Sequence, residues 1–174
     1  LGSVLLLMVI SLYMTGVSTG TKNLKISRLN ADLHVLITLM ERDLRRAGFG
    51  GDAYLVGATN IKSVNINSDQ NCIVYYYNHN HSQLLESSNK MAFSLKNDTL
   101  KFKTNVSKVA ETVCEDVSGW KSISDKGFIK ITQLVFTEEI TSHAQTTIVI
   151  NLSGELIADS RYRHSISTSV QVRN

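Results

Sequence analysis

The sequence contains no proline at all, and its first segment contains no charge. Ordinary usage of about 5% would place roughly nine prolines in a chain of this length, yet its 174 residues include none. Proline inside a helix removes a hydrogen bond and kinks or breaks the helix, so its absence permits very long helices. Residues 1–21 also lack any charged side chain. An uninterrupted helix with an apolar first part is therefore compatible with the chain.

Common catalytic and metal-binding patterns are also scarce. The chain has no H-E-x-x-H motif, no C-x-x-C motif and no D-x-[DN]-x-[DN]-G calcium loop. Its 43% apolar and 19% charged residues suit a chain that buries a core, which excludes a wholly disordered or collagen-like protein. We therefore predict one folded domain that is not an enzyme and needs no cofactor or metal.

The first part of the chain is strongly apolar. Only Ser11 and Tyr13 interrupt the apolar side chains of residues 4–14, and the uncharged run is about long enough for a bilayer span of roughly 20 residues. A signal peptide, a buried core helix and a membrane helix are the alternatives, but a signal peptide has a basic segment before its apolar run. We expect residues 1–22 to be a membrane or filament-core helix, formed through Val4, Leu5, Leu6, Leu7, Met8, Val9, Ile10 and Leu12.

The next residues continue the helical pattern with one apolar face. Apolar side chains recur every three or four residues, the period of a helix that packs on a core, at Leu29, Leu33, Leu36, Met40, Leu44 and Ala47. Gly48 can supply the positive φ that commonly ends a helix. The sequence thus predicts one helix over residues 1–47, about 70 Å long at 1.5 Å per residue. Residues 23–48 would pack on the rest of the chain.

Alternating apolar and polar residues predict β-strands in the second part of the chain. The clearest signal is a hairpin with a two-residue turn at residues 97–98, which sets the cross-strand pairs Phe93–Phe102 and Leu95–Leu100. Further strands are predicted at residues 72–77, 129–137, 146–152 and 164–172. A change of apolar parity at residues 132–133 predicts a β-bulge.

These elements predict the fold class and the organisation of the chain. Residues 49–71 are rich in Gly, Asn and Ser and are expected to be a linking region with at most short strands. Residues 72–174 would form an antiparallel head domain. A helix followed by strands is typical of an α+β fold, here a long N-terminal α-helix packed on an antiparallel β-sheet.

Two cysteines, Cys72 and Cys114, are present. A zinc site would need further Cys or His ligands at short spacing, and a catalytic thiol would need a base that the sequence does not identify. We predict a disulfide between them, which requires an oxidising compartment such as the periplasm or the cell exterior. Two unpaired buried cysteines are the alternative.

Three short patterns could bind a ligand, but each has a simpler interpretation. The glycine-rich residues 48–51 follow a helix, whereas phosphate loops precede one, so helix termination is favoured. The His-Asn-His sequence of residues 79–81 could chelate a metal, although a solvated loop is the better interpretation. Glu138-Glu139 is most simply the polar end of a strand.

A small basic cluster raises the question of nucleic-acid binding. Arg161 and Arg163 flank an aromatic residue, and Lys121 follows the single tryptophan, so these three cations could contact DNA. An exposed loop before the final strand is the favoured interpretation of residues 161–164. The net charge of +3 permits an acidic partner but does not require nucleic acid.

Three parts of the chain resemble one protein family, in the expected order. Residues 39–49 (LMERDLRRAGF) resemble the helix exit of type IV pilus minor pilins of the PilW type and of the related J pseudopilins of type II secretion. Residues 119–123 (GWKSI) followed by residues 131–136 (ITQLVF) are similar to a paired element of that group. Residues 169–174 (SVQVRN) resemble its C-terminal strand.

The resemblance implies how the chain begins and assembles. Members of the group start, after cleavage by a prepilin peptidase, with a short apolar block whose glutamate pairs with a neighbouring subunit. Neither feature can be assigned in this sequence, so we expect that roughly three helical turns precede Leu1, which would complete an ordinary membrane helix.

The resemblance also implies a role. A minor pilin would prime assembly of a type IV pilus or sit at its tip, serving adhesion, twitching motility or DNA uptake. Its partners would be other minor and major pilins, contacted through the N-terminal helix, with no small-molecule substrate and with DNA or a surface ligand at the tip. It would reside in the bacterial inner membrane with a periplasmic head and then in the pilus. A J pseudopilin and a membrane-anchored periplasmic binding domain are the alternatives.

Overall fold

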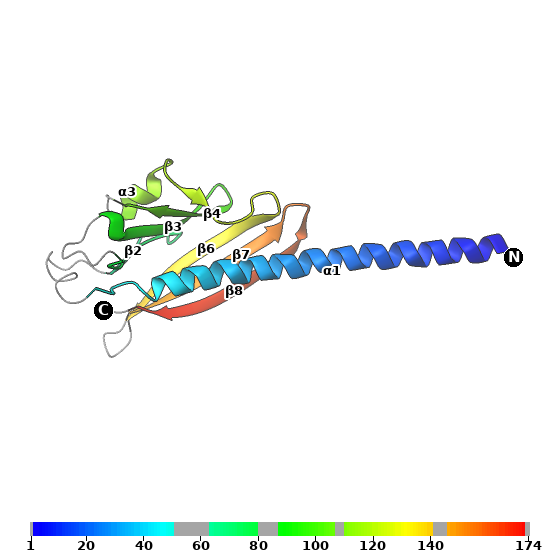
Figure 1. Ribbon diagram of the computed structural model, residues 1–174, viewed down its shortest axis with the longest axis horizontal. Coiled ribbons are helices and arrows are strands. Elements are labelled where there is room, and N and C mark those ends of the chain that lie inside the picture. The colour runs from blue at the N-terminus through cyan, green and yellow to red at the C-terminus, as the bar shows by residue number, and fades with distance from the viewer. Residues whose placement is uncertain (1, 51–62, 80–86, 107–109, 141–145, 173–174) are drawn as a thin grey trace.

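A long N-terminal helix packs on antiparallel sheets, which confirms the predicted α+β class. The structure, a computed structural model, describes residues 2–50, 63–79, 87–106, 110–140 and 146–172. Its helices are α1 (Gly2–Leu44), α3 (Ala110–Glu115) and the 3₁₀ helix η1 (Ser87–Asn89). Figure 1 shows that one half of α1 lies along the head, whereas the other half extends beyond it to the N-terminus.

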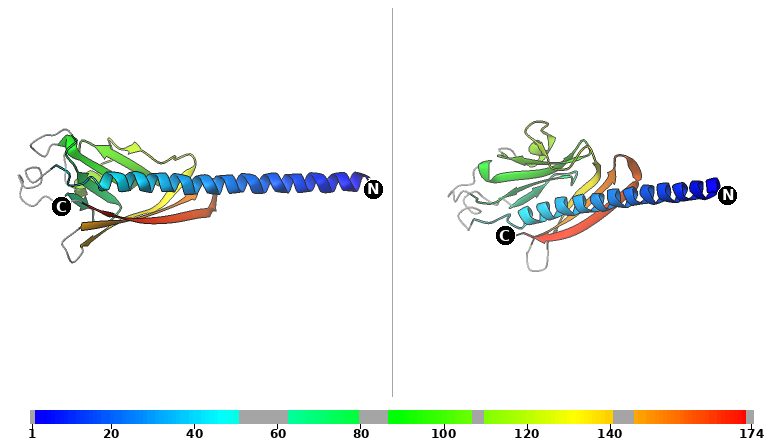
Figure 2. Two further views of the ribbon diagram at one scale, coloured as in Figure 1. Left: turned by 60° about the horizontal axis from the view of Figure 1, so that its bottom comes forward. Right: turned by 45° about the vertical axis from the view of Figure 1, so that its right-hand side comes forward.

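The strands form two antiparallel sheets. A five-stranded sheet has the order β1-β2-β3-β4-β5, with β1 (Val64–Ile66), β2 (Cys72–Tyr76), β3 (Lys90–Lys96), β4 (Thr99–Thr104) and β5 (Lys121–Ser122). A three-stranded sheet contains β6 (Ile129–Ile140), β7 (Thr146–Leu156) and β8 (Asp159–Gln171) in that order. Helix α1 packs against β7 and β8, and both views of Figure 2 show β8 running beside it.

The end of α1 differs from the prediction. The helix ends at Leu44, earlier than the predicted Ala47, and residues 45–50 form turns. The Ala47 N–H donates to the Leu44 carbonyl at 3.0 Å, a three-residue spacing that tightens the chain. Gly48 then has a φ of 81°, and its N–H donates to the Tyr76 carbonyl at 2.8 Å. Glycine therefore reverses the chain here, as predicted, and ties the helix end to β2.

The predicted hairpin is confirmed. Strands β3 and β4 pair in the expected register, with the pairs Phe93–Phe102 and Leu95–Leu100. Asn97 and Asp98 have φ angles of 50° and 57°. A two-residue turn of type I′ needs positive φ at both central residues, and Asn and Asp tolerate it better than other non-glycine residues.

The three-stranded sheet confirms one prediction and corrects another. The β6–β7 register shifts between Ile131 and Gln133, which confirms the bulge. Strand β8 begins at Asp159, so the expectation that residues 161–164 form an exposed loop is wrong. They belong to the sheet because their backbone pairs with that of β7, with Arg163 opposite Glu155.

The docked half of α1 supplies one side of the core. The predicted apolar stripe is buried, with exposed fractions between 0% and 5%. It consists of Leu29, Leu33, Leu36, Met40 and Leu44 on α1 and of Ala47 in the turn that follows. These side chains join apolar residues of both sheets in one cluster. Gly154 on β7 permits the close approach, since an added Cβ would lie 3.0 Å from the Leu33 Cδ2 atom and 3.2 Å from the Lys130 carbonyl oxygen.

The predicted disulfide joins Cys72 at the start of β2 to Cys114 in α3, with Cα atoms 5.9 Å apart. The two cysteines are 42 residues apart in sequence, and closing a loop of that length stabilises the fold by about 4 kcal/mol in the chain-entropy description. The bond holds α3 against a second, small apolar cluster that includes Val74 and Val113. Nearby, burial and then the Lys101 ammonium lower the pKa of Lys96.

Candidate functional site

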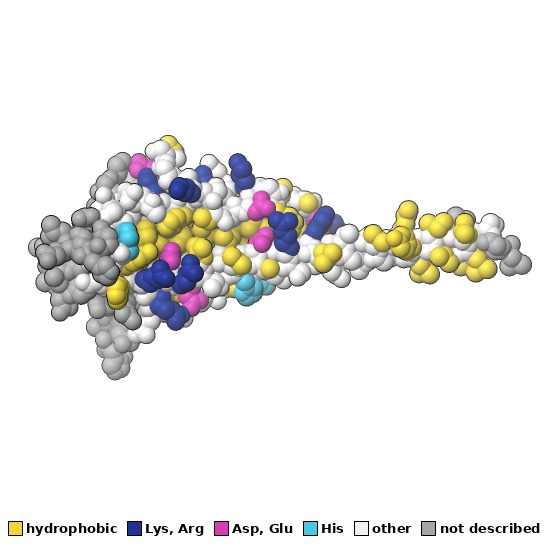
Figure 3. All heavy atoms as spheres, in the orientation of Figure 1, with side chains coloured by type: hydrophobic (Ala, Val, Ile, Leu, Met, Phe, Trp, Pro, Cys, Tyr) yellow, Lys and Arg dark blue, Asp and Glu magenta, His cyan; other side chains and the backbone are white. Residues whose placement is uncertain are grey.

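The projecting half of α1 exposes an apolar surface. Between Ser3 and Arg28, every side chain that the structure describes is exposed except the half-buried Ile26. Six of the predicted membrane or filament-core residues are 45% to 73% exposed, namely Leu5, Leu6, Met8, Val9, Ile10 and Leu12. The side chains of Val4 and Leu7 lie outside the described residues. Figure 3 shows these apolar side chains gathered on the projecting rod.

This surface is unusual for a water-soluble protein. Contiguous exposed apolar patches mark contacts with other proteins or with membranes, and here the patch surrounds the projecting half of α1, whose described side chains between Ser3 and Arg28 are exposed apart from the half-buried Ile26. No helix among the described residues is long and apolar enough to cross a membrane, so the expected membrane span is not supported.

An arginine marks the point where α1 leaves the head. The Arg28 guanidinium lies 3.9 Å from the centre of the Phe128 ring and donates to the Asp125 carboxylate at 3.0 Å. Asp32, one turn along the helix, lies 3.7 Å from the same guanidinium. Because burial begins at Leu29, these contacts fasten the first docked turn to the loop before β6.

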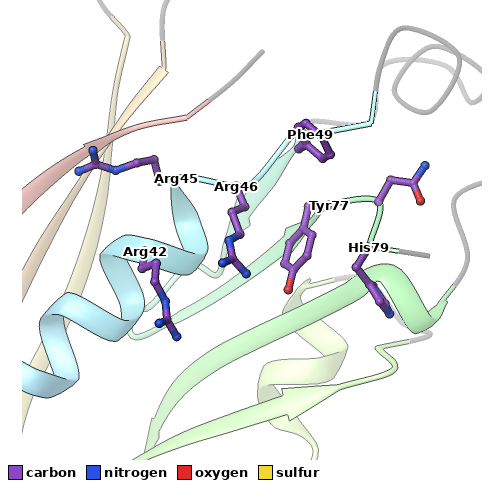
Figure 4. Close-up of a pocket in the computed structure, with 7 residues that line it drawn as sticks. Arg42, Arg45, Arg46, Phe49, Tyr77 and His79 are labelled. Carbon is purple, nitrogen blue, oxygen red and sulfur yellow. The ribbon is translucent and has the colours of Figure 1, made fainter. Parts of the chain in front are cut away.

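A hollow surface lies at the C-terminal end of α1 and was not anticipated from the sequence. It is a groove of about 580 Å³, hereafter the arginine groove, within the usual range of roughly 300–1,000 Å³ for ligand sites. It is lined by Arg42, Arg45, Arg46, Phe49, Tyr77, Asn78 and His79. Arg42 lies in the last turn of α1, and Arg45 and Arg46 lie in the turn that follows it. The segment after β2 supplies the tyrosine and the histidine, as Figure 4 shows.

Main-chain bonds and stacked rings hold the arginine groove in shape. The Asn78 N–H donates to the Phe49 carbonyl at 2.8 Å, which joins its two walls. The ring of Tyr77 stacks on Tyr75 at 6.4 Å and meets the edge of His79 at 6.0 Å. The Arg46 guanidinium lies 5.9 Å from the centre of the Tyr77 ring, on its face.

A buried tyrosine lies below this surface. The Tyr75 hydroxyl donates to the Asp43 carboxylate at 3.2 Å. Burial, and then the negative charge of Asp43, raise the pKa of Tyr75 well above its ordinary value, because both disfavour a phenolate. Tyr75 therefore stays neutral and serves as a structural hydrogen-bond donor.

The three candidate DNA contacts do not form one cluster. Lys121 lies on β5 of the five-stranded sheet, whereas Arg161 and Arg163 lie on β8 of the other sheet. Arg161 also pairs with Asp159 at 2.7 Å, and its hydrogen bond lowers the pKa of Asp159 to about 2. DNA binding stays a prediction, and no contact among the described residues favours it.

The other candidate sites either have no support among the described residues or lie outside them. Asn80 and His81 are not described, so the His-Asn-His prediction cannot be followed there. Within the described ranges, no group of three or more His, Cys, Asp and Glu side chains could hold a metal ion. Residues 16–20 match the letters of a G-x-S-x-G nucleophile motif, but Ser18 lies inside α1 and donates to the Thr15 carbonyl. That motif requires a strand-to-helix turn.

Comparison with known protein families gives evidence on the family of this chain. A family model described as PpdB, prepilin peptidase-dependent protein B, matches residues 22–172. The match spans the docked half of α1 and nearly all of the head. No curated protein and no solved structure shows significant similarity to the chain.

Proposed function

The chain belongs to the family of prepilin peptidase-dependent protein B, and on that premise we propose that it is a minor pilin which primes a type IV pilus or sits at its tip. Family membership makes it a prepilin peptidase-dependent protein related to pili or secretion. One observation supports the finer role, the apolar half of α1 that projects from a folded head.

The two halves of α1 suit the two environments of a pilin. Before assembly, the apolar half would lie in the bacterial inner membrane with the head in the periplasm, where a disulfide can form. Lipid tails are as apolar as leucine side chains, so moving this half into a filament core changes little hydrophobic free energy, and packing between helices decides the outcome. The docked half stays fixed to the head by its buried stripe.

This role is structural and not enzymatic. The proposed partners are other minor and major pilins, which meet the chain through the projecting half of α1. The arrangement offers that surface on all sides of the helix, as a subunit in a helical bundle requires. Adhesion, twitching motility and DNA uptake are the cellular activities that such a filament would support.

Two lysines placed on the projecting half would test the proposal. We expect Met8→Lys with Leu12→Lys to reduce pilus number and twitching to the level of a gene deletion, since two charges one helical turn apart cannot enter an apolar filament core at low cost. The matched control, Asn23→Lys with Ser27→Lys, has the same spacing on the exposed polar part of α1 and should stay near wild type. Electron microscopy and a twitching assay measure both.

A gene deletion that leaves pilus number, twitching and DNA uptake unchanged would contradict the proposal. Loss of protein secretion with normal pili would instead assign the chain to a type II secretion system as a J pseudopilin. Crosslinking from residues 8–25 that captures no pilin would point to a membrane-anchored binding domain.

A further inference from the structure

We infer that the arginine groove binds an acidic, partly apolar segment of a neighbouring pilus subunit. The inference rests on the proposed function. It adds a contact between the head and a neighbouring subunit to the contact made by the projecting half of α1. Five properties of the described residues support it: charge, stacking, rigidity, exposed apolar surface and the extent of the groove.

The groove has an excess of positive charge. Arg45 pairs with Glu41, and Asp43 accepts a hydrogen bond from a buried tyrosine, so both carboxylates of these turns are engaged. Among the described residues, no carboxylate pairs with Arg42 or Arg46. In Figure 4 these two guanidiniums point to the Tyr77 side of the helix, whereas Arg45 points away. Compensation of the helix dipole favours cations at this end of α1. Arg42 and Arg46 are two such cations beyond Arg45, and within the described ranges no carboxylate occupies their N–H donors.

Arg46 lies over an aromatic face, which prepares it for a carboxylate. A guanidinium held at a ring face by a cation–π contact still has N–H donors for another partner. These donors match the two oxygens of a carboxylate and bind them in a bidentate manner. The Arg46–Tyr77 contact at 5.9 Å and the stacking of Tyr77 on Tyr75 reduce the rotamer entropy lost on binding.

The walls of the groove are fixed relative to each other. The Gly48 N–H donates to the Tyr76 carbonyl, and the Asn78 N–H donates to the Phe49 carbonyl, both at 2.8 Å. These bonds join the turn after α1 to the end of β2. The site is therefore present before a partner arrives, which favours affinity because little ordering is required.

The apolar surface indicates a polypeptide segment and not a small anion. Phe49, in the turn after α1, is 51% exposed at the groove, and Val35 on α1 is 65% exposed. A second hollow of about 360 Å³, lined by His34, Val35, Thr38, Leu39 and Arg42, shares Arg42 with the arginine groove. The combined surface thus extends along several turns of α1. An inorganic anion would occupy only the arginines, whereas a segment with carboxylates beside apolar residues can occupy the whole length.

Photo-crosslinking in cells tests this partner directly. A photo-reactive phenylalanine analogue replaces Val35 in the full chain, expressed with its own pilus genes, and crosslinked subunits are identified by mass spectrometry. We expect a crosslink to another pilin at a peptide that contains Asp or Glu. Arg42→Gln with Arg46→Gln should reduce its yield at least tenfold, whereas the matched control Arg163→Gln with Lys121→Gln should change it less than twofold.

A charge exchange gives the decisive result. Arg42→Glu with Arg46→Glu should abolish the crosslink, and replacing the identified partner carboxylate by arginine should restore it. Thermal unfolding of each variant checks that the head is intact, which we expect because both arginines are exposed.

An equal loss of crosslink in the control variant or a crosslinked peptide without Asp or Glu would overturn the inference. A gel shift with a single-stranded oligonucleotide that depends on Arg42 and Arg46, without any crosslink to a subunit, would overturn it as well. A parallel crosslinker at Leu12 separates the two proposals. If Leu12 captures pilins and Val35 does not, this inference fails alone; if neither does, the proposed function fails as well.

Discussion

At the scale of single residues, Tyr75 shows how a buried polar group joins α1 to β2. Its side chain is fully buried, and its hydroxyl donates to Asp43 in the last turn of the helix. An unpaired buried hydroxyl would cost the fold free energy, so the bond fixes how the helix end sits on the sheet. The pKa of Tyr75 is raised by burial first and by Asp43 second.

Removing the Tyr75 hydroxyl should produce a stability difference between wild type and variant that depends on pH. We expect Tyr75→Phe to lower the free energy of unfolding by about 1 kcal/mol near neutral pH. Tyrosine in the unfolded chain ionises near pH 10, whereas folded Tyr75 resists ionisation. Its contribution is therefore complete below about pH 10 and is lost as the pH rises through its folded pKa.

Urea unfolding at several pH values would measure the difference between wild type and variant. The gap between them should narrow above about pH 10. A gap that stays constant between neutral and strongly alkaline pH would contradict the role given to burial.

Some single residues could be predicted and others could not. The two cysteines could be paired from sequence because no other ligand or base accompanied them. From the sequence, the only role that could be predicted for Arg46 was compensation of the helix dipole. Its aromatic partner, Tyr77, lies about 30 residues further along the chain, and the turn at Gly48 brings the two together. Nothing in local spacing indicates such a contact.

At the scale of elements, the distance between α1 and β7 is set at one glycine. A Cβ at Gly154 would meet the Leu33 Cδ2 atom at 3.0 Å and the Lys130 carbonyl oxygen at 3.2 Å. Both distances are shorter than ordinary contacts, so a larger residue must push the helix or the neighbouring strand aside. The fully buried Leu33 fills the space opposite that glycine.

Two substitutions at this contact should partly compensate for each other. We expect Gly154→Ala to destabilise the head by about 1–3 kcal/mol through overpacking and Leu33→Ala by about 2–5 kcal/mol through a cavity. In the double variant the new methyl group occupies part of that cavity, so the loss should be smaller than the sum.

Denaturant unfolding of the four proteins in this cycle gives the coupling energy. Met40→Ala with Gly154→Ala is the control, because the clash at Gly154 involves Leu33 and not Met40. In this control, the two losses of unfolding free energy should add. If the losses from Leu33→Ala and Gly154→Ala also add, the proposed contact is contradicted.

Elements with a strong local period could be predicted with their register. The β3–β4 hairpin is fixed by Asn97 and Asp98, whose positive φ angles suit the turn, so its pairing follows from the sequence. The start of β8 could not be predicted, because residues 159–163 lack a clear alternation. They become a strand through pairing with β7, as Arg163 does with Glu155.

At the scale of the whole molecule, α1 has two halves with different surroundings: one is packed on the head and the other is exposed. Its buried stripe begins at Leu29, and Arg28 fastens the same turn to Asp125 and Phe128. The described residues before Arg28 contribute no buried side chain. Of the two halves of α1, only the second should therefore contribute to the stability of the head.

Truncation would separate the two halves. We expect removal of residues 2–23 to change the free energy of unfolding of the head by less than about 0.5 kcal/mol, since exposed positions contribute little. Removal through residue 36 should abolish folding, because it deletes Leu29, Leu33 and Leu36 at about 2–5 kcal/mol each, which approaches the total stability of a domain. Circular dichroism melts would measure both, and a marked loss in the shorter truncation would contradict this division.

The sequence alone determined the properties that depend on neighbours along the chain. Helical period, absence of proline and a turn of Asn and Asp are local, so the stripe from Leu29 to Ala47, the β3–β4 register and the α+β class could all be predicted. The tertiary structure decided what depends on distant segments meeting: the earlier end of α1 at Leu44, the inclusion of Arg163 in β8, and the arginine groove. These features arise because hydrogen bonds such as that from Gly48 to Tyr76 form only once helix and sheet have packed together.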